Sequence, residues 1–162
     1  MNTQDFYKIL SEADTPEDAY AGLGALADHL VGAKLFTLLT FDPQVGMARR
    51  FYSNMPDAYP VSGTKPVPTN DWGEKVLMRG ETFAGNDIET LAAVFPDYAL
   101  IQSLGCESCL NVPVIVTGDV YGTINCLHVA GHYTPDRVAA SEALKLPGAA
   151  CFLLTHLVSR SA

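Results

Sequence analysis

Two runs of alternating apolar and polar residues, separated by Gly118-Asp119, constrain the fold of this chain more than any other feature. The first run ends at Thr117 and the second begins at Val120. A two-residue period is typical of β-strands, and glycine at the first central position of a two-residue loop fits a type II′ turn. The pattern therefore predicts an antiparallel hairpin in which Thr117 lies opposite Val120.

This register assigns the hairpin side chains to two faces. It places Asn111 opposite Cys126 and Cys109 opposite His128. Because successive side chains of a strand point to opposite faces, these polar groups share one face, which we interpret as the wall of a cavity. The other face is apolar and is expected to pack on helices; it comprises Leu110, Val112, Val114, Val116 and Leu127. A slip of one residue would exchange the faces.

Composition narrows the class of protein. At 162 residues and 48% hydrophobic, the chain suits a single domain spanning 1–162 that needs no disulfide or metal to form a core. The net charge of −8, with ten scattered Lys and Arg, excludes a phosphate-backbone binder, so we expect no nucleic-acid partner. We find no signal-like N-terminus and no apolar run of roughly 20 residues, which predicts a cytoplasmic protein without a membrane partner and with reduced cysteines.

Capping residues and helical spacing predict the remaining elements. The predicted helices are Thr3–Glu12, a second from the Thr15 cap to Val31, one from Asn70 to Gly80, one over 88–95, one over 97–104, and a last from Thr134 toward Val158. The predicted strands are Lys34–Phe41, Met47–Ser53 and Thr82–Ala84, besides the hairpin. Residues 54–69 carry four prolines and are expected to form an irregular loop. Pro147 should bend the last helix near Ala143.

Two motifs in this order resemble the GAF family. Residues 119–125, Asp-Val-Tyr-Gly-Thr-Ile-Asn, are similar to the G-x-x-x-G-x-[IL]-N hairpin of GAF domains, and residues 133–136, Tyr-Thr-Pro-Asp, to their [FY]-[ST]-x-x-[DE] helix start. The resemblance covers roughly residues 15–158. It implies an α+β, PAS-like fold with a central antiparallel sheet of five or six strands. The terminal helices would cover one face, and a ligand cavity and short helices the other.

The resemblance narrows the fold more than the function, because GAF domains bind cyclic nucleotides, bilins, haem or small metabolites. Our preferred hypothesis is a non-catalytic, small-molecule-binding sensor domain without a cofactor, forming a homodimer through its terminal helices. We expect no attached output domain, so signalling would need a partner protein. The expected apolar walls of the site are Trp72, Phe83, Phe95 and Tyr98, and the expected polar anchors are Asn86, Asp87, Glu107, Asn111 and His128. Trp72 and Phe95 also sit at core spacing, where plain packing is the alternative.

An enzymatic alternative rests on the cysteines. Cys106-Glu107 resembles the catalytic Cys-Asp of GAF proteins that reduce free methionine-R-sulfoxide. Those enzymes carry a resolving cysteine upstream, whereas residues 54–105 contain none, so Cys109 or Cys126 would have to resolve a sulfenic acid on Cys106. The competing interpretation is that small thiols simply fill space in the sheet.

Metal and chromophore sites are weaker alternatives. Cys106, Cys109, His128 and His132 are four possible zinc ligands, but residues three apart on a strand point to opposite faces, and no metal site is predicted. The Cys-His pair of bilin-binding GAF domains and the Asn-Lys-Phe-Asp-Glu motif for cyclic nucleotides are absent. A third class of function is a structural dimerisation module with a collapsed core and no ligand.

Overall fold

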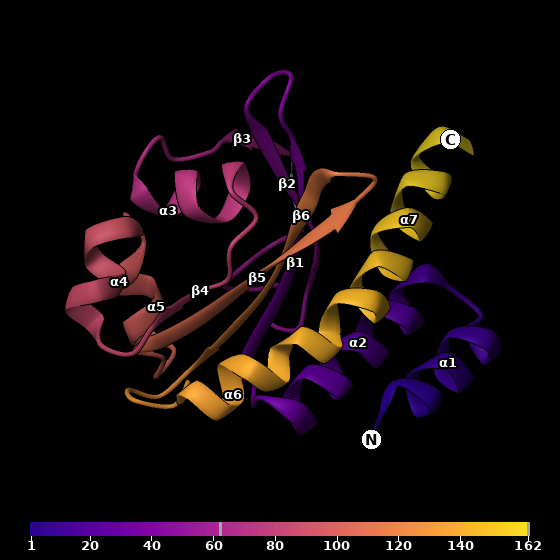
Figure 1. The fold of residues 1–162 in the computed structure, drawn as a ribbon, viewed down its shortest axis with the longest axis horizontal. Coiled ribbons are helices and arrows are strands. Elements are labelled where there is room, and N and C mark those ends of the chain that lie inside the picture. Colours follow the sequence, from indigo (N-terminus) through magenta and orange to yellow (C-terminus); the bar gives the residue numbers. More distant parts are fainter. Residues whose placement is uncertain (62, 162) are drawn as a thin grey trace.

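An antiparallel sheet of six strands, in the order β3-β2-β1-β6-β5-β4, organises the computed structural model, which describes residues 1–61 and 63–161 (Figure 1). The strands are β1 (Leu35–Asp42), β2 (Met47–Ser53), β3 (Thr64–Pro66), β4 (Phe83–Gly85), β5 (Ser108–Val116) and β6 (Asp119–His128). Every neighbouring pair is antiparallel. The predicted α+β fold is confirmed.

Helices cover both faces of this sheet. They are α1 (Thr3–Glu12), α2 (Pro16–Leu30), α3 (Asp71–Gly73), α4 (Ile88–Val94), α5 (Tyr98–Ser103), α6 (Pro135–Ala140) and α7 (Lys145–Ser161), with a π-helical turn at Glu74–Met78 and a 3₁₀ turn at Ser141–Leu144. The terminal helices α2, α6 and α7 lie on one face, with α1 packed outside α2, and the short helices α3 to α5 lie on the other (Figure 1). This is the predicted division of the helices.

Local signals explain where several helices begin and bend. Thr15 caps α2: its side chain accepts from the Asp18 amide, and the Asp18 carboxylate accepts from the Thr15 amide. In the last helical segment, the 3₁₀ turn at Ser141–Leu144 separates α6 from α7 just before Pro147. Proline has no amide hydrogen and crowds the carbonyl four residues earlier, so the predicted irregularity near Ala143 is confirmed.

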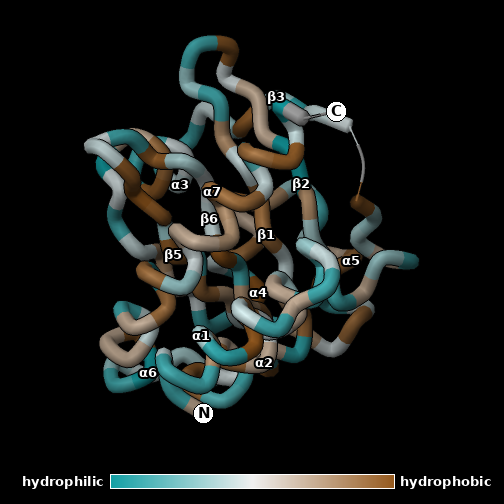
Figure 2. The backbone as a smooth tube through the Cα atoms, turned by 90° about the vertical axis from the view of Figure 1, so that its right-hand side faces the viewer, coloured by the Kyte–Doolittle hydropathy of each residue, from teal (hydrophilic) through white to brown (hydrophobic). Residues whose placement is uncertain are grey.

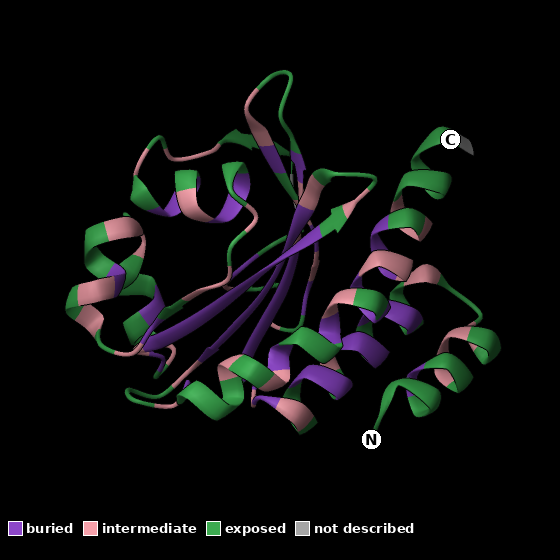
Figure 3. Cartoon of the chain, in the orientation of Figure 1, coloured by how far each residue is buried: buried purple, intermediate pink, exposed green. Residues whose placement is uncertain are grey.

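The main core lies between the sheet and the terminal helices. Leu23 and Leu26 of α2 are completely buried, as are Leu110 and Val112 of β5. Figure 3 shows the central strands buried along most of their length, and Figure 2 shows the hydrophobic stretches of the chain running through the middle of the molecule. Burial of these apolar side chains is the dominant force that holds the helices to the sheet.

The hairpin turn differs from the predicted one. Val116 pairs with Asp119, so Thr117 and Gly118 are the central residues. Their φ angles are 53° and 91°, as a type I′ turn requires. A bulge beyond the turn leaves Tyr121 without a partner on β5, so the pairing continues one residue away from the predicted register.

This slip leaves the assignments on β5 correct and makes those on β6 wrong. Asn111 lies opposite Asn125, and Leu110 opposite Cys126. Cys126 is therefore fully buried in the core under the terminal helices instead of facing a cavity. His128 pairs with Ser108, and its ring stacks on that of His132 with 3.6 Å between the ring centroids.

Two further expectations need correction. The loop predicted over 54–69 contains β3, a short edge strand that pairs with β2. The strand was not predicted because it contains a proline and its three residues are exposed, so it shows no alternation of apolar and polar residues. The helix predicted after the Asn70 cap is a single α-helical turn followed by a π-helical one.

One helical segment, Pro135–Arg160, is long and apolar enough to cross a membrane by length and hydropathy alone. Core helices of soluble proteins pass the same test, and this segment lies against the sheet and α2.

Candidate functional site

A cavity of about 320 Å³ lies between the sheet and the segment that carries the short helices. Its walls are largely aliphatic and aromatic, and they include Leu35, Leu39, Phe41, Ala48, Trp72, Leu77, Phe95, Ile101 and Leu127. The Trp72 and Phe95 rings meet edge to face at 5.6 Å. Interlocked rings of this kind form a rigid apolar wall.

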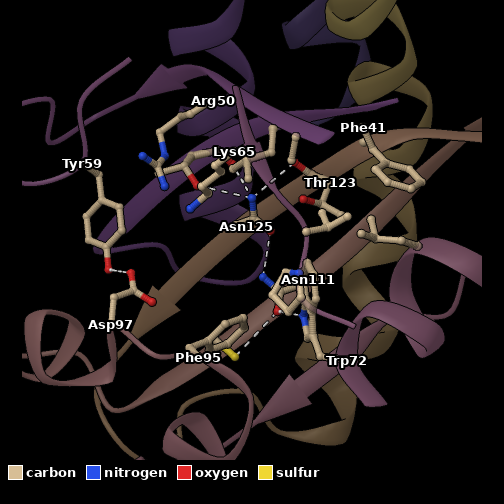
Figure 4. Close-up of a pocket in the computed structure, with 18 of the residues that line it drawn as sticks. Phe41, Arg50, Tyr59, Lys65, Trp72, Phe95, Asp97, Asn111, Thr123 and Asn125 are labelled. Carbon is tan, nitrogen blue, oxygen red and sulfur yellow. Dashed lines mark hydrogen bonds between the residues drawn. The ribbon is translucent and has the colours of Figure 1, made fainter. Parts of the chain in front are cut away.

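A chain of side-chain hydrogen bonds crosses the sheet face of the cavity (Figure 4). The Trp72 indole N–H donates to Asn111 Oδ1 at 2.9 Å, and Asn111 Nδ2 donates to Asn125 Oδ1 at 2.7 Å. Asn125 Nδ2 in turn lies 3.3 Å from Thr37 Oγ1. The chain exists because the hairpin register sets the two asparagines directly opposite each other. Its members hold one another in place, and the amides of Asn111 and Asn125 face inward.

Two basic side chains, a phenol and a carboxylate lie at the end of the cavity away from Trp72 (Figure 4). Arg50 of β2 donates from Nη1 to the Pro60 carbonyl at 3.2 Å, and its guanidinium lies 4.8 Å from the centre of the Tyr59 ring. The Tyr59 hydroxyl donates to Asp97 Oδ2 at 2.7 Å. Lys65 of β3 completes this end, and Figure 4 shows all four side chains around the pocket.

Burial shifts the protonation of these groups. It lowers the pKa of Arg50, whose guanidinium nevertheless stays charged. The pKa of Lys65 is lowered, first by burial and then by the nearby charge of Arg50. The pKa of Tyr59 is raised by burial and by its hydrogen bond to Asp97, so this phenol is a neutral donor at physiological pH.

The sequence profile of the GAF domain family matches residues 23–144. This chain belongs to the GAF domain family. No curated protein matches it. Solved structures share the fold at low identity, which carries no information about the ligand.

Three of these structures illustrate the likeness. The GAF domain of a Coxiella burnetii phosphoenolpyruvate-protein phosphotransferase has a TM-score of 0.72 at 17% identity, covering 98% of this chain and 93% of that one. The GAF domain of a Bacillus halodurans two-component sensor histidine kinase has a TM-score of 0.68 at 15% identity, covering 91% and 99%. The chromophore-binding domain of a bacteriophytochrome from R. palustris has a TM-score of 0.66 at 8% identity, covering 98% of this chain and 60% of that one.

Within this GAF domain, the cavity brings together four of the residues predicted from the sequence. Trp72, Phe95, Cys109 and Asn111 all line it. Trp72 is 7% exposed and Asn111 is 4% exposed, so both contact the interior of the site rather than its rim.

Six other residues predicted to bind the ligand lie outside the pocket lining. Phe83 packs behind Phe95, with 6.4 Å between the ring centroids. The Asn86 side chain bonds the amide and carbonyl of Tyr133, which fastens the middle segment to the start of the last helices. These two residues support the site from outside.

The remaining four have local structural roles, face solvent or lie on the other face of the sheet. Asp87 caps α4 by accepting from the Thr90 amide at 2.7 Å. Tyr98 is 40% exposed on α5, and Glu107 accepts from Gln102 Nε2 at 3.2 Å. His128 lies on the opposite face of the sheet, as the corrected register requires. Its pKa is lowered, first by burial and then by the charge of Arg137.

The cysteines do not form a reactive cluster. All four are free and buried. Burial raises the pKa of Cys106, raises that of Cys109 to about 12, and raises that of Cys126 as well. Since the thiolate is the nucleophile, this environment disfavours redox chemistry. Cys126 is separated from Cys109 by the sheet, so the two do not share a site.

The ligand types considered for zinc also fail to converge. His128 and His132 stack on each other on the face of the sheet that the terminal helices cover, whereas Cys109 lies on the face that lines the cavity. Among residues 1–61 and 63–161, no group of three or more His, Cys, Asp or Glu side chains is arranged to hold a metal.

Thiol accessibility gives a direct test of this picture. At pH 8, a disulfide reagent such as dithionitrobenzoate is expected to label the native protein at least a hundred-fold more slowly than the protein in urea, where all four thiols react. Absorbance of the released thiolate measures both rates. Rapid labelling of Cys106, located by mass spectrometry and lost in Cys106→Ser, would contradict the buried geometry and favour the enzymatic alternative.

The residues at the basic end of the pocket were not predicted from the sequence. The two-residue period of β2 sets Ala48 and Arg50 on one face, and that signal was available. Asn125 required the correct hairpin register. Tyr59 lies in the loop between β2 and β3, and Asp97 lies in the short connection between α4 and α5; no periodic pattern places a side chain in either segment.

Proposed function

We propose that this GAF domain is a non-catalytic sensor or regulatory domain that binds a small molecule in the cavity. The observation that carries the proposal is the cavity itself. Its volume of about 320 Å³ lies at the lower end of the range of small-molecule sites, and its apolar walls surround a few fixed polar groups. A collapsed core with no ligand would leave no such space.

The relatives support the same class of function. Members of the GAF family commonly bind small molecules, and the matched domain from R. palustris is described as chromophore-binding. The matched Bacillus halodurans domain belongs to a sensor histidine kinase. GAF domains are typically soluble and cytoplasmic, and we propose the same location here, with no nucleic-acid or membrane partner.

Trp72 provides the experiment, because it is the single tryptophan of the chain and lines the cavity. A library of small metabolites is expected to contain compounds that change its fluorescence and raise the melting temperature. Ligand at 100 times its dissociation constant adds about 2.7 kcal/mol to the free energy of unfolding, which corresponds to a rise of about 5–10 °C.

The matched control fills the cavity. Ala48 is 5% exposed and faces the pocket, so Ala48→Phe would occupy the ligand's space with its ring. Ligand-induced shifts should disappear in this variant while its melting temperature without ligand stays close to that of the wild type. A library that shifts neither protein would sink the sensor proposal and favour a structural module.

We also propose that two copies pair through α7. Leu146, Leu153 and Leu157 form an exposed stripe on this helix, 74%, 41% and 62% exposed. Residues 145–161 contain no Asp or Glu, although the whole chain carries a net charge of −8, so α7 is free of the acidic repulsion expected elsewhere. A self-complementary apolar stripe of this kind suits a two-fold dimer.

Sedimentation equilibrium tests the dimer. The wild type is expected at twice the chain mass and Leu153→Glu at the chain mass, because the new carboxylate would be desolvated between two apolar helices. Ile115→Glu places the same charge at an exposed site on the β5–β6 hairpin and should leave the dimer intact. A wild type that sediments as a monomer at all concentrations contradicts the pairing.

A further inference from the structure

We propose that the pocket selects a monoanionic carboxylic acid with an apolar body, with the carboxylate between Arg50 and Lys65 and the body against Trp72 and Phe95. The inference rests on the proposed function of the cavity as a ligand site. It adds the chemical class of the ligand, which the shape of the cavity alone leaves undefined.

The first argument is that two cations of the pocket have no anionic partner. Within the described part of the chain, neither Arg50 nor Lys65 forms an ion pair, whereas the surface residues Arg79 and Lys145 do. The chain has 18 acidic residues for ten Lys and Arg, yet among the described residues only the Asp97 carboxylate acts on these two cations, and it forms no ion pair with either. Arg50 is half-buried, and a charged group that is partly desolvated in a cavity is normally paired, whereas Lys65 reaches the pocket from its exposed edge.

The second argument is an unused hydrogen-bond donor. Arg50 Nε is buried and has no acceptor among the described residues, although Nη1 of the same guanidinium bonds the Pro60 carbonyl. Such orphaned donors are rare in native proteins and call for an acceptor supplied from outside the chain. A carboxylate oxygen is the strongest acceptor for a guanidinium N–H.

Among the described residues, the carboxylate that acts on these two cations, Asp97, is already engaged. Asp97 accepts from the Tyr59 hydroxyl, and no ion pair joins it to Arg50. Two cations and one carboxylate leave a single net positive charge at this end of the pocket, which a monoanion neutralises and a phosphate dianion exceeds. Tyr59 also supports the guanidinium through its ring face.

The opposite end of the cavity disfavours a polar ligand body. Asn111 Oδ1 accepts from Trp72, and Asn111 Nδ2 donates to Asn125, so the amide chain is largely satisfied internally. The surrounding walls are aromatic and aliphatic. At about 320 Å³ the cavity has room for roughly ten water-sized groups, the scale of an arylalkanoic acid.

A matched pair of probes tests the charge of the ligand. Calorimetry and Trp72 fluorescence should show that 3-phenylpropanoate binds at least ten times more tightly than 3-phenylpropanamide, which has the same shape and no charge. Arg50→Gln and Lys65→Gln should each weaken binding of the acid about tenfold and leave the amide unchanged. Inorganic phosphate should not displace the acid at equal concentration.

Arg49→Gln is the control, since it removes the same charge from the neighbouring residue, which is exposed and does not line the pocket. It should retain the preference for the acid. Circular dichroism checks that each variant is folded, and Lys65 at the exposed edge keeps the test valid if Arg50→Gln fails to fold.

Several results would overturn the inference. Equal binding of acid and amide, a preference that survives both pocket substitutions, displacement by phosphate, or no binding of the acid at about 10 mM would each do so. In those cases, other compounds of the library can still change Trp72 fluorescence in the wild type but not in Ala48→Phe, and that result would uphold the sensor proposal. Only a failure of the whole library removes the proposed function itself.

Discussion

Gly122→Ala is expected to lower the free energy of unfolding by about 3 kcal/mol or more. Gly122 lies in β6 where that strand passes β1 and α7. A methyl group there would overlap the carbonyl oxygen of Leu39 and the ring of Phe152. The carbonyl belongs to the backbone of the adjacent strand, so the clash is relieved only by separating β1 from β6, the two strands at the middle of the sheet.

Urea denaturation followed by circular dichroism measures this effect. Gly63→Ala is the matched control, because a methyl group at Gly63 would meet no atom within 4 Å. That variant should stay within about 0.5 kcal/mol of the wild type. A Gly122→Ala protein as stable as the wild type would show that β1 and β6 are not as closely paired as the structure has them.

Phe152→Ala is expected to cost about 3–5 kcal/mol and to lower the melting temperature by about 6–20 °C. Phe152 of α7 is 1% exposed and meets the Phe51 ring edge to face at 5.2 Å. Removing the ring leaves a void between the last helix and the sheet, which a close-packed core cannot fill without moving its backbone.

Differential scanning calorimetry measures the change, with Tyr7→Ala as control. Tyr7 of α1 also carries an aromatic ring but is 69% exposed and lies outside the proposed dimer stripe, so its truncation should change the stability by less than about 0.5 kcal/mol. Because Phe152 packs on the face of the sheet opposite the cavity, the folded fraction of Phe152→Ala should still bind pocket ligands. A loss smaller than 1 kcal/mol would contradict the packing of α7 on the sheet.

Most elements of the fold follow from short-range signals in the chain. The Thr15 cap, the apolar stripe of α2, and the proline that bends the last helical segment act over a few residues, and each appears where it was predicted. The match of Tyr133 to Asp136 with the GAF helix start places the beginning of α6 in the same way.

The register of the β5–β6 hairpin depended on more than its turn residues. A type I′ turn at Thr117-Gly118 displaced the pairing, and the bulge at Tyr121 recovered only part of the displacement. Since side chains alternate at every residue, this slip moved Cys126 and His128 out of the predicted site and brought Asn125 into it.

The sequence by itself determined the helices, the alternating strands and the membership of the GAF family, because these depend on the chemistry of neighbouring residues. Only the tertiary structure decided which side chains share the cavity. Arg50, Tyr59 and Asp97 lie on separate segments, and they meet because the sheet order and the packing of the short helices bring those segments together. Contacts between distant segments are set by the sum of packing energies over the whole core, which no local pattern encodes.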